Sequence, residues 1–118
     1  MKKLLLLLLL IPNLVMAVLK TYTIEKIPTN ISGAYAKNFK CISHSSEIGH
    51  WSTITFNLVN KSSKSIRQPY LVVYDKDMDP IDEKFLGNMT IVVNSGKAFE
   101  TFLKSYRCED VTHGIRVR

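Results

Sequence analysis

The chain has 118 residues and carries 16 Lys and Arg against 10 Asp and Glu, a formal net charge of +6. This length is enough for one hydrophobic core and therefore for one domain. The basic residues are spread along the chain without the dense Lys/Arg cluster of a nucleic-acid-binding protein, which argues against a nucleic-acid partner. We interpret the charge as favouring solubility, with an anionic partner as the alternative.

The N-terminus has the three parts of a secretory signal peptide. Two lysines precede an apolar run that begins with leucines at 4–10, and Val15-Met16-Ala17 places suitable residues before a cleavage point. We predict cleavage after Ala17, which leaves a single domain over residues 18–118 that is periplasmic or secreted. The alternative is a retained membrane anchor. A spanning helix needs about 20 apolar residues, and this stretch is shorter and broken by Pro12-Asn13, so no membrane span is expected after cleavage.

Cys41 and Cys108 are the only cysteines. An even count in an exported chain predicts one disulfide between them. In the chain-entropy model it would stabilise the fold by roughly 4 kcal/mol. The sequence has no Cys-x-x-Cys pair for redox chemistry, and two lone cysteines make a poor zinc site.

Strands are predicted along the whole domain, because runs of Val, Ile, Thr, Tyr and Phe alternate with polar turns and no 3.6-residue period appears. The clearest strand has Ile54, Phe56 and Leu58 on one face. Pro69 suggests an edge position or a bulge, and Gly87 suggests a bend. Short turns between such strands are typical of a β-sandwich rather than a βαβ sheet. In chain order, the predicted strands are 19–24, 39–42, 51–59, 66–74, 85–93, 98–108 and 113–117.

Three segments between Phe56 and Leu103 stand in the order of a known family. They are Phe56-Asn57-Leu58-Val59-Asn60 before a Ser-rich turn, Tyr70-Leu71-Val72-Val73-Tyr74-Asp75, and Asn94-Ser95-Gly96-Lys97-Ala98-Phe99. Together they resemble the FxLYD-type domain, an immunoglobulin-like module of exported prokaryotic proteins. The last segment lacks the proline of that family's Pro-Gly turn, and the turn after Asp75 lacks its glycine. The resemblance implies an immunoglobulin-like or fibronectin III-like antiparallel β-sandwich of about seven strands, without enzymatic activity.

A second pattern is similar to antibody domains, which carry a Cys, a Trp and a Tyr-x-Cys. Cys41, Trp51 and Tyr106-Arg107-Cys108 match it, but this register assigns Trp51 to a different strand. We prefer the first register and expect Trp51 in the core or at its edge. Most aromatic side chains on strands are also expected in the core: Tyr70, Tyr74, Phe85, Phe99, Phe102 and Tyr106.

The acidic segment 75–83 is a candidate calcium site, because alternate carboxylates can converge on one hard cation. Its candidate ligands are Asp75, Asp77, Asp79 and Asp82. Pro80 stands where an EF-hand loop needs Gly, and Leu86 where it needs the bidentate Glu. Asp and Pro are ordinary turn residues, so we predict a solvated turn and no cofactor.

Two further clusters have a chemical interpretation. His44, Glu47 and His50 could bind a transition metal, but their spacing is loose and a solvated loop is expected. Ser43, Ser45 and Ser46 lie beside His44 without a Gly-x-Ser-x-Gly elbow. No catalytic residues are therefore predicted, and the chain is not expected to be an enzyme.

These observations favour an exported, non-catalytic binding module with an unidentified protein partner. The alternative is a secreted effector that mimics a host receptor, or a periplasmic inhibitor or immunity protein. An edge strand, such as the one after Pro69, would allow pairing with a partner strand or a homodimer with a second copy.

Overall fold

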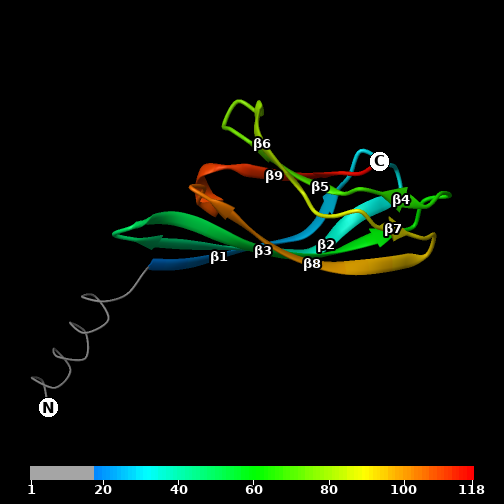
Figure 1. The fold of residues 1–118 in the computed structure, drawn as a ribbon, viewed down its shortest axis with the longest axis horizontal. Coiled ribbons are helices and arrows are strands. Elements are labelled where there is room, and N and C mark those ends of the chain that lie inside the picture. The colour runs from blue at the N-terminus through cyan, green and yellow to red at the C-terminus, as the bar shows by residue number, and fades with distance from the viewer. Residues whose placement is uncertain (1–17) are drawn as a thin grey trace, which may run out of the picture.

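The computed structural model describes residues 18–118, and strands dominate it (Figure 1). Sheet A has the order β1-β2-β3-β8, formed by Val18–Pro28, Ala34–Ser46, Gly49–Asn60 and Ser95–Lys104. Sheet B has the order β6-β5-β9, formed by Pro80–Phe85, Tyr70–Tyr74 and Thr112–Arg116. A small pair joins β4 (Ile66–Arg67) to β7 (Thr90–Ile91), and the 3-10 helix η1 covers Cys108–Asp110. Every strand ladder is antiparallel, so the predicted all-β class is confirmed.

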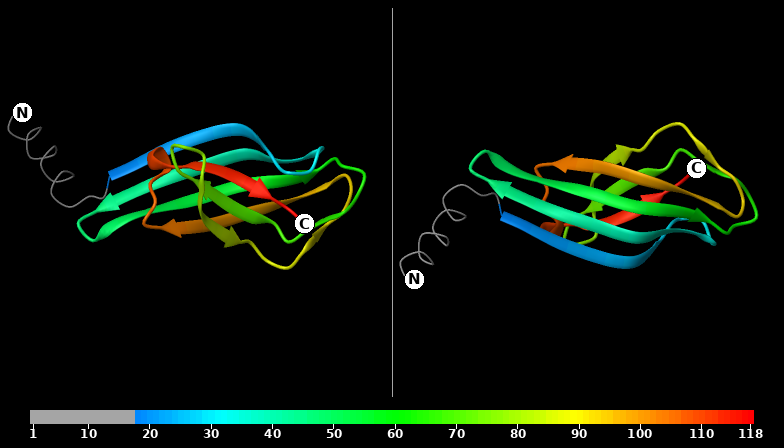
Figure 2. Two further views of the ribbon diagram at one scale, coloured as in Figure 1. Left: turned by 90° about the horizontal axis from the view of Figure 1, so that it is seen from above. Right: turned by 90° about the horizontal axis from the view of Figure 1, so that it is seen from below.

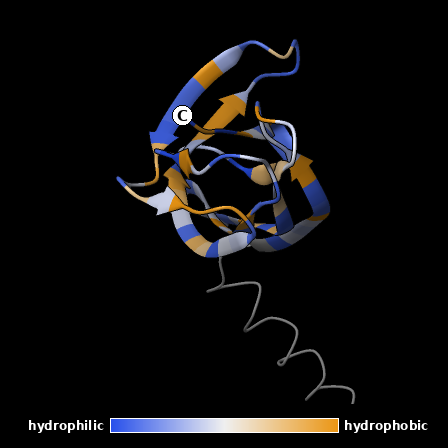
Figure 3. Ribbon diagram, turned by 90° about the vertical axis from the view of Figure 1, so that its right-hand side faces the viewer, coloured by the Kyte–Doolittle hydropathy of each residue, from blue (hydrophilic) through white to orange (hydrophobic). Residues whose placement is uncertain are grey.

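The two sheets pack face to face as a sandwich, with sheet B above sheet A in Figure 1. The predicted alternation in β3 is confirmed, since Ile54, Phe56 and Leu58 are all buried. Leu71 and Val73 of sheet B meet them from the opposite layer in one core cluster. Each such side chain contributes about 1.5–3 kcal/mol when fully buried. Figure 3 shows hydrophobic and hydrophilic residues alternating along the strands.

Three phenylalanines form the aromatic part of this core. Phe39 on β2, Phe56 on β3 and Phe99 on β8 stack across sheet A, with centroids 5.8 Å and 5.3 Å apart. Of the six aromatics expected in the core, Phe99 is buried and Tyr106 packs partly buried against the core, whereas Phe85 and Phe102 are exposed. The expectation failed because those two occupy outward positions at the sheet edges.

A bulge in β2 explains why only part of this strand was predicted. The register with β3 shifts between Lys37 and Lys40, and Asn38 has a φ of +54°. The extra residue keeps both Ala36 and Phe39 in the core although they are three positions apart. Simple alternation is lost at this point, so the observed strand begins five residues before the predicted one.

The predicted strand 66–74 is divided in two. Gln68 has a φ of +48° and Pro69 lacks a backbone donor, so the ladder stops between β4 and β5. The strand after Pro69 was expected at an edge, but β5 lies between β6 and β9. It is therefore the central strand of sheet B and is not available for pairing with another chain.

The predicted strand 85–93 is also wrong. The Asp75–Asp79 turn closes a hairpin, and β6 begins at Pro80, which an edge strand tolerates. Gly87, with a φ of +127°, lies in the loop that follows, and only β7 remains strand. The strand predicted over 98–108 ends at Lys104, because Ser105 adopts a φ of +68°.

The Cys41–Cys108 disulfide is present, as predicted, with a Cα–Cα distance of 6.0 Å. It joins β2 of sheet A to η1, which leads directly into β9 of sheet B, so it fastens the two layers together. The predicted signal peptide lies outside the described residues. Within residues 18–118, no helix has the length and apolar character of a membrane span.

Candidate functional site

The β2–β3 hairpin extends beyond the short strands of sheet B at one end of the sandwich (Figure 1). Its strands have 13 and 12 residues, whereas those of sheet B have five or six. The turn at Glu47–Ile48 leads into Gly49, whose φ of +137° favours glycine. Ile48 at this tip is 92% exposed, so the hairpin presents an apolar side chain that the rest of the domain does not cover.

Next to the tip, two stacked aromatic rings lie on the outer face of sheet A. His44 and Trp51 are directly opposite in the β2–β3 register, and their rings are parallel with centroids 5.0 Å apart. His44 Nε2 also lies 3.1 Å from Thr53 Oγ1, which fixes the imidazole. Trp51 is half-buried and points away from the core, so its expected core position is wrong. The odd-numbered positions of β3 all face outward, a signal that was already present in the sequence.

Phe102 extends this apolar surface across to β8. It pairs with Thr53 in the register and is 52% exposed. Lys84 holds it in place: its Nζ lies 4.4 Å from the ring centroid and donates a 2.7 Å hydrogen bond to the Phe102 carbonyl. We call the set His44, Ile48, Trp51 and Phe102 the hairpin face.

A groove of about 590 Å³ runs along the hairpin face between β3 and β8. Aromatic side chains with one apolar surface and one accessible edge are typical of recognition sites, and exposed apolar patches with a polar rim mark interfaces. The groove combines aromatic side chains with an apolar patch and a polar rim. Its lining includes Ile48, His50, Trp51, Thr53, Phe102 and Lys104.

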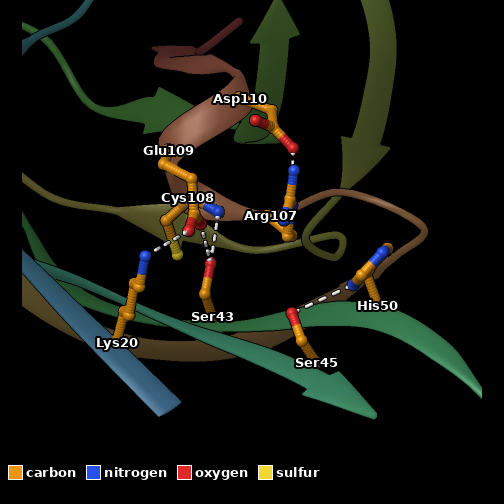
Figure 4. Close-up of polar contacts among 8 residues, drawn as sticks. All are labelled: Lys20, Ser43, Ser45, His50, Arg107, Cys108, Glu109 and Asp110. Atoms are coloured by element: carbon orange, nitrogen blue, oxygen red, sulfur yellow. Dashed lines mark hydrogen bonds and ion pairs between the residues drawn. The ribbon is translucent and has the colours of Figure 1, made fainter. Parts of the chain in front are cut away.

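A polar cluster lies beside the disulfide, where η1 meets β2 (Figure 4). Ser43 is buried; its hydroxyl donates a 2.5 Å hydrogen bond to Glu109 Oε1 and accepts one of 2.7 Å from the Cys108 N–H. Lys20 Nζ lies 3.7 Å from Glu109 Oε2. The hydrogen bond from Ser43 is the main reason that the pKa of Glu109 lies below its usual value.

This arrangement makes Ser43 a structural residue. A nucleophilic serine gives its proton to a neighbouring base such as histidine, whereas the proton of Ser43 is held by a carboxylate. His50 lies nearby but its Nδ1 bonds Ser45 Oγ at 2.9 Å. Arg107 is paired with Asp110 at 2.7 Å on the outer side of η1. The cluster therefore fastens η1 to sheet A.

The acidic turn brings together three of its four candidate calcium ligands. Carboxylate oxygens of Asp75, Asp77 and Asp79 lie within 4.8 Å of one another. Asp82 stands apart on β6, where its Oδ1 accepts the Glu83 N–H. Asp75 Oδ1 accepts the backbone N–H groups of Asp77 and Asp79, both at 2.9 Å. These bonds explain the convergence as turn geometry.

Comparisons of the chain with protein-family models, with curated proteins and with solved structures found no match. The FxLYD resemblance of residues 56–103 therefore stays a prediction.

Sequence reasoning missed Ile48 and Phe102 as surface residues. Side chains alternate between the two faces of a strand, and Phe102 stands at an even-numbered position between the buried, odd-numbered Phe99 and Leu103. This alternation was the signal in the sequence that could have placed Phe102 on the surface.

Proposed function

We propose that the protein is an exported, non-catalytic immunoglobulin-like module that binds another protein through the hairpin face. The observation that carries this proposal is the projecting β2–β3 hairpin, with Ile48 almost fully exposed at its tip and Trp51 behind it. An isolated exposed apolar residue is ordinary, but an apolar tip next to an aromatic platform and a groove has the composition of an interface core.

Export is supported by two independent features. The N-terminal sequence has the organisation of a signal peptide, and a disulfide that joins the two sheets persists in an oxidising compartment. We infer a periplasmic or secreted location. Cell fractionation tests this: recovery of the oxidised protein in the periplasm or the medium supports it, and retention in the cytoplasm would contradict it.

The strand order supports the immunoglobulin-like part of the proposal. In immunoglobulin domains, strands A, B and E form one sheet and strands C and F are neighbours in the other. Here β2-β3-β8 has the A-B-E arrangement and β6-β5-β9 the C′-C-F arrangement, with β1 added beside β2. The disulfide differs, because it starts from the A-like strand instead of the B-like one.

The experiment is capture of the partner by the exported, oxidised protein from envelope or host extract. Ile48→Asp is expected to abolish capture, because a charge at the centre of an apolar contact is costly to desolvate. Val92→Asp is the matched control: Val92 is also exposed, at 56%, but lies in the turn before β8, at the far end of that strand from Phe102. Equal capture by both variants would contradict the proposed surface.

A further inference from the structure

The sandwich is open along one side, between the outer strand of sheet A and the outer strand of sheet B. β1 is the edge of sheet A there and β9 the edge of sheet B, as the view from above in Figure 2 shows. The end of β9 is closed by a bridge from Thr29 to Ile115 and by the Asn30 amide, which bonds the Val117 N–H and carbonyl at 2.8 Å and 3.0 Å. Within residues 18–118, the backbone of 112–114 has no strand partner on this side.

An apolar groove of about 240 Å³ occupies this opening. Tyr22 and Ile24 on β1 line one wall. The β1–β2 register places them opposite Cys41 and Phe39, both buried, so they lie on the inner face of sheet A. They are nevertheless 37% and 45% exposed. Inward-facing side chains of a sandwich are normally covered by the other sheet, but no strand of sheet B among residues 18–118 lies beyond β9 to cover these two.

The floor of the groove is uncharged. It is formed by Phe39, the Cys41–Cys108 disulfide and His113, whose ring centroid is 5.2 Å from that of Phe39. Burial lowers the pKa of His113 to about 4, so the imidazole is neutral at physiological pH. Among the described residues, no Lys, Arg, Asp or Glu lines the groove, which suits a segment without charge.

The other edges of the sandwich carry features that prevent strand pairing. Natural edge strands are protected by prolines and by charged side chains. β6 has Pro80, Asp82 and Glu83, and β8 has Lys97, Glu100 and Lys104. Residues 111–114 are Val-Thr-His-Gly and have no such protection. The unprotected backbone edge therefore coincides with the uncovered apolar groove.

We infer that this groove binds an extended, uncharged segment of a partner protein, which adds a strand to sheet B beside β9. Its backbone would pair with 112–114, and its alternate side chains would enter the groove beside Ile24 and Phe39. Side chains on one face of a strand recur about every 7 Å, so the unpartnered stretch accommodates roughly two of them. The added strand would take the position that strand G has in an immunoglobulin sheet. This site is separate from the hairpin face and does not depend on it.

The test is an NMR titration of the ¹⁵N-labelled, exported and oxidised protein with the capped peptide Ser-Thr-Val-Thr-Val-Thr-Ser. Amide shift changes are expected at Val111–Gly114 and at Tyr22–Ile24. A control peptide with proline in place of the central threonine is expected to cause none, since it cannot complete the ladder.

Variants of β1 make the test specific. Ile24→Lys puts a charge into the groove and is expected to weaken peptide affinity about tenfold or more, because an unpaired charge is costly to bury. Thr21→Lys adds the same charge to the outer face of β1 and is expected to keep the affinity. Both residues are exposed, so both variants are expected to fold, as well-dispersed spectra would verify.

Three results would overturn the inference: no shift changes at millimolar peptide, changes located on β8 or β6, or equal affinity in the two lysine variants. Ile48→Asp is expected to leave the peptide titration unchanged. A result that contradicts binding in the groove can therefore be told apart from one that contradicts binding at the hairpin face.

Discussion

The side chain of Asn60 connects three segments at the end of β3. It is fully buried; its amide donates to the carbonyls of Lys64 and Ile91, both at 2.9 Å, and its Oδ1 accepts from the backbone N–H and the hydroxyl of Ser62. A buried amide is costly unless all of its groups are satisfied, and here they are. This explains in physical terms why an asparagine stands between an apolar strand and a serine-rich turn.

Asn60→Ala is expected to lower the free energy of unfolding by about 2–4 kcal/mol, because it removes the amide donor of the buried Ile91 carbonyl and the acceptor that orders the turn at Ser62. Asn88→Ala is the control: this exposed amide accepts one bond from Gln68, and its loss should cost about 0.5 kcal/mol or less. Urea denaturation measures both. Similar losses in the two variants would contradict the role assigned to Asn60.

His113 makes stability depend on pH. Burial lowers its pKa from 6.5 to about 4, so between these values the unfolded chain binds a proton that the folded chain does not. The free energy of unfolding is therefore highest above pH 6.5 and falls as the pH drops toward 4, by about 3 kcal/mol in total.

His113→Gln is expected to flatten this dependence between pH 6.5 and about 5, while His50→Gln, at an exposed position, is expected to keep it. Below pH 4.5, protonation of Glu109 adds a further loss in every variant, since its folded-state pKa is lowered. Denaturant midpoints across this pH range measure the effect. An unchanged slope in His113→Gln would show that another group is responsible.

The alternation of apolar and polar residues predicted which side chains are buried better than residue type did. The even-numbered side chains of β3 are buried, as the alternation indicated: Ile54, Phe56 and Leu58. The same alternation places the odd-numbered Trp51 on the outer face. The expectation that Trp51 lies in the core or at its edge came from the preferred register of the family resemblance and not from this alternation. Residue type alone cannot separate a core aromatic from an aromatic on an outer sheet face, because both are favourable in strands.

At the level of elements, η1 is attached to sheet A by the disulfide, by the Lys20–Glu109 ion pair and by the hydrogen bonds of Ser43. Ser43 fixes both the Glu109 carboxylate and the Cys108 N–H. Ser43→Ala is expected to lower the free energy of unfolding by about 1–3 kcal/mol and to speed hydrogen exchange at the Cys108 amide. Ser45→Ala, which removes only an exposed bond to His50, is the control. Unchanged exchange in Ser43→Ala would contradict the proposed attachment of η1.

The errors in predicted strands share a cause. The segments 66–74 and 85–93 have suitable residues, but pairing decides which of them form strands. β5 takes β6 as its hairpin partner across the acidic turn, which moves the strand to Pro80–Phe85 and leaves Gly87 in a loop. Such pairing joins segments that are separated in the sequence, so the strand propensity of a single segment cannot predict it.

At the scale of the whole molecule, the disulfide closes a loop of 67 residues between the two sheets. The double variant Cys41→Ala, Cys108→Ala is expected to lose about 4 kcal/mol of unfolding free energy, because the unfolded chain gains conformational freedom. Denaturation of the oxidised protein and of the variant measures this difference. A loss below about 1 kcal/mol would contradict a structural role.

The all-β class and the disulfide followed from composition, alternation and the even cysteine count. The two surfaces offered as binding sites did not. The hairpin face depends on sheet A being longer than sheet B, and the groove depends on sheet A having one strand more. Both are relations between sheets, so they become visible only when the layers are assembled.

The most direct test of the proposed function is the dissociation constant of the captured partner for two variants of the exported protein. Trp51→Ala is expected to weaken binding by at least about 2 kcal/mol, roughly 30-fold, as for a central aromatic residue of an interface. Val92→Ala, at the far end of β8 from Phe102, is expected to leave the constant unchanged. Equal constants for the two variants would contradict recognition through the hairpin face.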